Sequence, residues 1–240
     1  MSDLTDLEKT LSLLNDKVRN NVKIVTPKDI GQDVLYHLTT RKSNKFVPTI
    51  SRIAAPSEDN TLPRFHTSTH LIGCIQGYSL ILNDILIKDV YFEEDREVPH
   101  GEYFLYTFKF DYALRPNKRL VFDADITNEH WLITFNEKTK YYTPIETNKL
   151  FFSSLIIEPN KLKGKDFHIL FDLSVENSLR IDERTTLPKG YYEIEVIFNN
   201  SELLFKLNGY KEISRSQFQK DKELKTVMLG FSQHSKLLNW

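Results

Sequence analysis

Two histidines, His66 and His70, have a spacing at which a helix would present both imidazoles to one metal ion. The sequence predicts a strand at His66, however, and no Cys, Asp or Glu stands nearby at a convincing ligand spacing. We therefore expect no metal site. The single cysteine, Cys74, lies in the apolar run 71–75, which favours a buried side chain over a nucleophile.

Other familiar catalytic motifs are missing from the sequence. The eight glycines form neither G-x-G-x-x-G nor a P-loop pattern, and G-x-S-x-G is absent. A formal net charge of -1 gives no global field for nucleic acid or an anionic membrane, so neither is an expected partner. Since no run approaches the ~18 apolar residues of a membrane span, and no signal-peptide pattern opens the chain, we expect a cytoplasmic protein.

A more specific pattern extends over five short motifs. They are Tyr-His-Leu-Thr at 36–39, an acidic loop at 57–60, Arg-Phe-His-Thr-Ser at 64–68, Gly-Cys at 73–74 and Glu-His-Trp at 129–131. Their order resembles the ADP-ribosyltransferase-like superfamily, and in particular its small bacterial and phage members. In that superfamily a His or Arg on one strand, a Ser, Thr or Tyr on a second and a Glu on a later strand surround NAD.

The resemblance covers about residues 30–140 and implies an enzyme that uses NAD as its substrate. NAD would be cleaved at the nicotinamide bond, and ADP-ribose would pass to a macromolecular acceptor. Glu129 would stabilise the positive charge that develops on the anomeric carbon. His37 and Ser68 would complete the catalytic set by binding the ribose hydroxyls. The remaining contacts to NAD would come from Thr39, Arg64 (to a phosphate), Thr67, and Tyr78 or Trp131 (stacked on nicotinamide).

Each of these residues also has a structural interpretation. His37 is compatible with a core histidine, Ser68 with a cap for the following helix, Glu129 with a solvated loop and Trp131 with the core. The sequence also departs from the superfamily at Thr127, where a Glu or Gln usually precedes the catalytic Glu by two positions. The resemblance therefore does not predict which macromolecule is the acceptor.

Geometry separates two hypotheses. NAD chemistry requires His37, Ser68 and Glu129 to converge on one concave surface. If any two of them lie on opposite faces of the sheet, we expect instead a protein that binds a partner, such as a host protein in the case of a phage-encoded chain, without chemistry.

The elements that position these residues are predicted to be mostly strands. Thr5 and Glu8 fit a capping box at the start of a helix. A stripe of Leu7, Leu11, Leu14 and Val18 makes this helix amphipathic, to pack on its own domain or on a partner. Periodicity and residue type then predict a helix at 70–78 and strands at 34–40, 46–53, 64–69, 102–111, 120–122 and 130–135.

From about Leu150 the pattern changes to strands at short intervals. These strands are predicted at 151–159, 167–175, 191–198, 202–210 and 226–231, with turns that include 199–201 and 208–209. We predict an antiparallel sheet with little helix before the last thirty residues. The sequence thus indicates an α+β protein with an N-terminal amphipathic helix (1–25), a β-rich ADP-ribosyltransferase-like domain (26–148) and a C-terminal antiparallel β domain (149–240).

Overall fold

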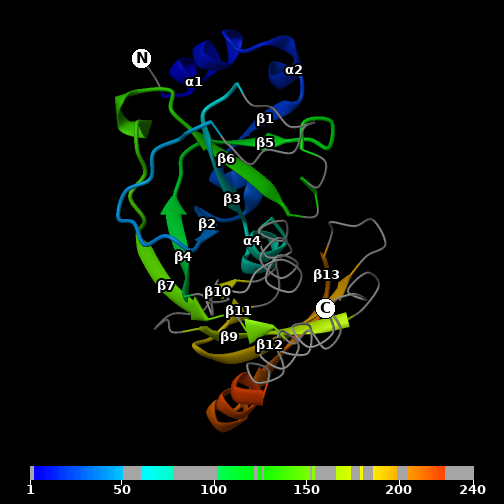
Figure 1. The fold of residues 1–240 in the computed structure, drawn as a ribbon. Coiled ribbons are helices and arrows are strands. Elements are labelled where there is room, and N and C mark those ends of the chain that lie inside the picture. Colours follow the sequence, from blue (N-terminus) through cyan, green and yellow to red (C-terminus); the bar gives the residue numbers. More distant parts are fainter. Residues whose placement is uncertain are drawn as a thin grey trace, which may run out of the picture. The chain divides into compact units, whose positions relative to one another are not determined.

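The structure is a computed structural model, shown in Figure 1. It describes residues 3–50, 61–77, 102–121, 124–125, 127–151, 153–154, 166–173, 179–180, 186–198 and 205–224. Within these ranges the chain is an α+β protein, as predicted. It divides into two compact units, one from residues 1–77 and 105–147 and the other from residues 78–104 and 148–240.

A seven-stranded sheet contains the strands of the first unit. Its strands, in spatial order, are β1 (Val22–Val25), β5 (Ala113–Pro116), β6 (Glu129–Ile133), β3 (Arg64–Ser68), β2 (Val34–Thr39), β4 (Glu102–Lys109) and β7 (Glu146–Phe151). The pairings from β1 through β5, β6 and β3 to β2 are all antiparallel. The predicted strands at 34–40, 64–69, 102–111 and 130–135 are confirmed, whereas β1, β5 and β7 were not predicted.

Two predicted strands are wrong. In the strand predicted at 46–53, only Phe46 and Thr49 form bridges, because Pro48 between them has no amide hydrogen to donate. Residues 51–53 lie outside the described residues. In place of the strand predicted at 120–122, Leu120 and Val121 form a turn, and both of their amides donate to the Asn117 carbonyl oxygen. Leu120 and Val121 are apolar because they are buried in the core, not because they belong to a strand.

The N-terminal segment contains two helices, α1 (Asp3–Ser12) and α2 (Asp16–Arg19), rather than one. The helix is interrupted because the Asn15 side chain accepts a hydrogen bond from the Val18 amide (2.9 Å) and so caps the start of α2. The predicted capping box is also wrong, since Thr5 lies inside α1. The apolar stripe does pack on its own unit: Leu7 and Val18 are buried with Trp131 in one core cluster.

The other short helices of this unit are α3 (Pro27–Ile30), α4 (Leu71–Gly77) and η1 (Glu137–Thr139). Helix α4 confirms the helix predicted at 70–78 and packs against β2 and β3. Among the described residues, no helix is long and apolar enough to cross a bilayer.

The second unit contains an antiparallel sheet, as predicted. Its strands, in spatial order, are β13 (Phe205–Ile213), β12 (Gly190–Phe198), β9 (Asp166–Leu173) and β8 (Ser153–Ser154); β10 (Leu179–Arg180) pairs separately with β11 (Thr186–Leu187). Phe171 and Tyr192 stack in its core with ring centroids 5.2 Å apart. A helix at 215–224 packs Phe218 against Tyr191, 4.8 Å between ring centroids.

One turn predicted in this unit is wrong. Asn208 and Gly209 lie inside β13, where a register shift leaves Asn208 as an extra residue opposite β12. The predicted turn at 199–201 and the predicted strand at 226–231 lie outside the described residues.

Candidate functional site

The register between β3 and β6 brings several of the predicted site residues together. Ser68 pairs with Glu129, and His66 pairs with Trp131. Because directly opposed residues share a face and alternate residues of one strand share a face, these side chains lie on one side of the sheet together with that of Arg64. We call this set, which consists of Arg64, His66, Ser68, Glu129 and Trp131, the Glu129 cluster.

Glu129 is the first residue of β6 and is only 8% exposed. Its Oε1 accepts hydrogen bonds from Trp131 Nε1 (2.8 Å) and from His66 Nδ1. Burial alone would raise the pKa of Glu129, but the charge and hydrogen bond of His66, the Trp131 hydrogen bond and the Arg64 charge outweigh it. The pKa therefore lies below its usual value, and the carboxylate is ionised at neutral pH.

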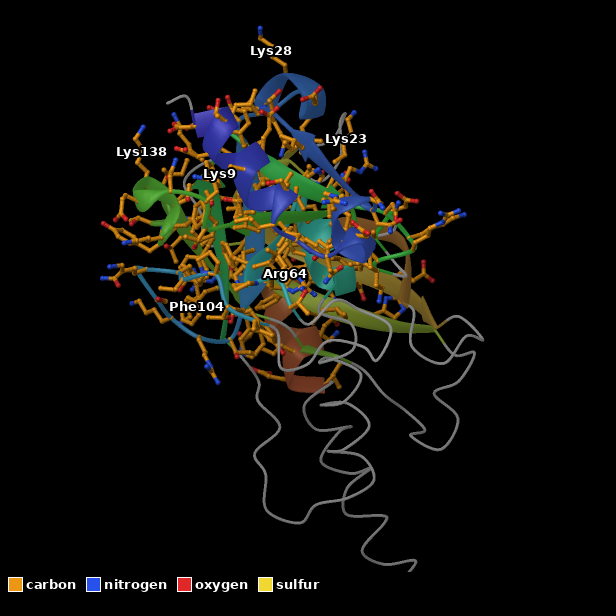
Figure 2. The ribbon with its side chains drawn as sticks, turned by 90° about the horizontal axis from the view of Figure 1, so that it is seen from above. Lys9, Lys23, Lys28, Arg64, Phe104 and Lys138 are labelled. Carbon is orange, nitrogen blue, oxygen red and sulfur yellow. The ribbon has the colours of Figure 1, made fainter. Side chains whose placement is uncertain are left out.

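Arg64 is held in the interior. It is 2% exposed, its guanidinium lies 4.3 Å from the Trp131 ring centroid, and Nη1 donates to the Leu62 carbonyl oxygen (3.3 Å). Figure 2 shows Arg64 among the strands, whereas Lys28 projects away from the molecule. This position makes Arg64 a counter-charge for Glu129, and it does not present the guanidinium to a phosphate group in solvent.

The Ser68 side chain forms hydrogen bonds with two backbone groups. Its Oγ donates to the Thr127 carbonyl oxygen (2.8 Å) and accepts from the His70 amide (3.3 Å) just before α4. Helix α4 lies so close that a Cβ at Gly73 would overlap both Ser68 Oγ and the Thr127 carbonyl oxygen. The side chain is 2% exposed and fixes the turn between β3 and α4. It does not cap the helix, because the Gly73 amide of α4 donates instead to His70 Nδ1 (2.8 Å).

His37 lies on the opposite face of the sheet. Tyr36 pairs with Ser68 and so shares its face, which directs the next residue, His37, to the other side. The His37 ring contacts Phe65, 4.4 Å between centroids, and its Nδ1 donates to the His66 carbonyl oxygen (2.8 Å). Burial lowers the pKa of His37 to about 4, so the ring is neutral at pH 7.

The prediction that His37, Ser68 and Glu129 converge on one surface is therefore wrong. Each of them lies on its own strand, as expected, but the pairing of β2 with β3 places His37 out of phase with the other two.

The remaining predicted NAD contacts are divided between the two faces. Thr67 alternates with Glu129-cluster positions on β3, and Thr39 is two residues from His37 on β2, so both share the face of His37. Thr67 Oγ1 donates to the His130 carbonyl oxygen (2.8 Å), and Thr39 Oγ1 accepts from the Arg41 amide (3.2 Å). Trp131 is fully buried, as the core interpretation expected, and Tyr78 lies outside the described residues.

Sequence reasoning missed the role of His66, which was weighed only as a metal ligand. Its side chain is 35% exposed, its Nδ1 binds Glu129, and its Nε2 is buried without a hydrogen-bond partner among the described residues. The alternation of Arg64, His66 and Ser68 along one strand was visible in the sequence, but the strand opposite was not. The described residues contain no group of three or more His, Cys, Asp or Glu that could hold a metal ion.

A second candidate site is an exposed surface on the two segments that pair at Phe46 and Tyr142. Phe46 and Tyr142 exchange two backbone hydrogen bonds (2.9 and 2.7 Å), so the segments on either side run antiparallel (Figure 1). The Phe46 ring stacks inward on Phe65, 5.2 Å between centroids. The exposed apolar side chains of this pair of segments are Val47 (55%), Ile50 (49%), Tyr141 (45%) and Ile145 (55%), which we call the ribbon surface.

No known protein family matches the chain, and neither a curated protein nor a solved structure matches it. Its function must therefore be inferred from its own residues.

Proposed function

We propose that the chain acts by binding a partner protein through the ribbon surface, and that it performs no chemistry on NAD. The observation that carries this proposal is the exposure of four large apolar side chains on two paired segments. Val47 and Tyr141 lie opposite each other beside the Phe46–Tyr142 bridge, and Ile50 and Ile145 are exposed further along the same two segments. Single exposed apolar residues are ordinary, but an opposed pair of them with further exposed apolar side chains on the same segments favours an interaction site.

The arrangement of the predicted NAD residues supports the same proposal. His37 is separated from Ser68 and Glu129 by the sheet. Ser68 and Arg64 are almost fully buried and are bonded to neighbouring protein groups. Such side chains hold strands and helices together without offering their polar atoms to a cofactor.

ADP-ribosyl transfer from NAD to a protein acceptor is the second candidate function, and one observation favours it. An ionised Glu129 lies beside His66, whose side chain is partly exposed and whose Nε2 is buried without a partner among the described residues. A fixed carboxylate can stabilise the oxocarbenium-like transition state of nicotinamide departure, and the partly exposed imidazole ring beside it would lie next to the ligand. Under this candidate Glu129 and His66 would form the site, and His37 would only stabilise the fold.

A site-specific crosslinking experiment tests the proposed function. A photoreactive amino acid is placed at Val47 in the full-length chain and, as a matched control, at Leu13, which is exposed in the α1–α2 connection. Incubation with bacterial cell extract should give one protein crosslinked from position 47 and not from position 13. Tyr141→Ser should remove that product. Equal products from the two positions would contradict the proposal.

Nicotinamide release from NAD is measured in the same extract to judge the second candidate. Nicotinamide release by the wild type that is lost in a Glu129 variant of checked stability would establish the enzyme. It would overturn the proposal that the chain performs no chemistry on NAD. Absence of release alongside the specific crosslink would leave partner binding as the function.

A further inference from the structure

We infer that the segment that docks on the ribbon surface is an acidic and apolar stretch of a protein, in which Asp or Glu side chains accompany large hydrophobic ones. This inference rests on the proposed function, because it names the chemistry of the partner for that same surface. It follows from the charges that border the four apolar side chains and from the fixed backbone that carries them.

Among the described residues of the two segments, cations outnumber carboxylates. Arg41, Lys42, Lys45 and Lys140 are exposed on the two segments, against the two carboxylates of Glu137 and Glu146. Glu137 pairs with Lys140 (2.7 Å), and Lys138 next to it is directed to Asp3 (3.3 Å). The described part of these segments therefore carries an excess of two positive charges, although the whole chain has a formal net charge of -1. A local field of this sign favours an acidic partner.

Lys45 connects the charge with the apolar contact area. Its Nζ lies 3.6 Å from the centroid of the Tyr141 ring, which places the ammonium group above an exposed aromatic face. A partner carboxylate at this ammonium would bring its neighbouring side chains over Tyr141 and Val47. One contact of this kind satisfies the charge and buries apolar area at the same time.

The backbone under this surface is held in place before any partner arrives. Tyr106 Oη accepts a hydrogen bond from the Ser43 amide (2.7 Å) and donates one to the Arg41 carbonyl oxygen (3.3 Å). Ser43 Oγ donates to the Lys45 carbonyl oxygen (2.7 Å). Because Tyr106 is fully buried in the sheet, these bonds anchor the cationic loop to the core. A surface that is ordered in advance loses less conformational entropy on binding.

An anionic bilayer is the competing occupant for a basic and apolar surface. Membrane attachment through basic residues relies on clusters of roughly 4–8 Lys and Arg on one side. Here Glu137 and Glu146 lie among the cations, and a bilayer of one charge sign would repel both. A protein segment, in contrast, can set its own carboxylates against the cations and leave apolar or neutral groups near Glu137 and Glu146.

The test uses two fluorescent peptides and the full-length chain. One peptide alternates Glu or Asp with Leu or Phe, and the other has Lys in place of every acidic residue. Fluorescence anisotropy should show the acidic peptide binding about tenfold more tightly than the Lys peptide, with affinity that falls as salt rises from about 50 to about 300 mM. Lys45→Glu should weaken the acidic peptide about tenfold, whereas Lys28→Glu, an exposed control on α3 (Figure 2), should not.

The outcomes separate the partner chemistry from the proposed function. Val47→Ser should weaken the acidic peptide and Leu13→Ser should not. If both peptides bind equally and Val47→Ser weakens both, the surface binds proteins but the acidic preference is overturned. If neither peptide binds the wild-type chain, the acidic preference is likewise overturned, and the crosslink from position 47 decides the proposed function alone. Tighter binding to phosphatidylserine vesicles than to the acidic peptide, with the same sensitivity to Lys45→Glu, would replace the protein partner by a membrane.

Discussion

Replacement of Glu129 by Gln tests whether charge holds the Glu129 cluster together. Gln keeps an oxygen for the Trp131 Nε1–H group, but it removes the negative charge that faces His66 and Arg64. Conversion of charge-assisted hydrogen bonds to neutral ones costs about 1–2 kcal/mol, and loss of the negative charge near the buried Arg64 guanidinium adds to this. We expect a loss of about 2–4 kcal/mol in the free energy of unfolding at pH 7. A solvated loop glutamate would lose less than ~0.5 kcal/mol.

The measurement is urea unfolding of the wild type and Glu129→Gln at pH 7 and near pH 4. Glu137→Gln, whose side chain is 85% exposed, is the matched control and should change little. The pKa of Glu129 lies below its usual value of 4.5 in the folded chain, so its contribution is complete above that value and is lost as the pH falls below it. The difference between wild type and variant should therefore shrink near pH 4. Equal stability of the two proteins at pH 7 would refute the buried ion-pair argument.

Three further predictions concern the fold. Burial lowers the pKa values of His37 and His130 to about 4, so the unfolded chain binds protons at higher pH than the folded one. The free energy of unfolding should therefore fall as the pH drops from 6.5 toward 4. His130→Gln should flatten this pH dependence in urea titrations, and an unchanged slope would contradict the prediction. Gly73→Ala should destabilise by about 3 kcal/mol or more because its Cβ would overlap the rigid Thr127 carbonyl, and Ser68→Gly should not rescue it. Asn15→Ala should cost about 1 kcal/mol through loss of the α2 cap, with Asn15→Ser close to wild type by thermal unfolding.

The sequence was sufficient to identify most strands of the first unit but not their register. Short runs rich in aromatic and β-branched residues mark β2, β3 and β4, most of whose side chains are buried. Which residue of β2 opposes Ser68 is decided by packing between distant segments, and a change of one position moves His37 to the other face. The prediction of a convergent site failed on that single step.

Local competition explains the other failures. The apolar stripe from Leu7 to Val18 continues across the break at Asn15, because both α1 and α2 pack on the same core. The stripe therefore predicts burial correctly and helix length incorrectly. At the other end of the chain, Asn208 and Gly209 are residues typical of turns, yet β13 absorbs them through an extra residue in its pairing with β12.

The Glu129 cluster also gives a reason for the motif order that does not involve NAD. The Glu129 carboxylate reaches His66 only when β3 and β6 pair as observed; a shift of one residue would direct Glu129 away from both His66 and Arg64. Buried ionic groups contribute little net stability, but they strongly disfavour pairings that separate them. On this argument Arg64, His66 and Glu129 specify strand register. Loss of nicotinamide release in a Glu129 variant would therefore indicate catalysis only if the variant kept the wild-type free energy of unfolding.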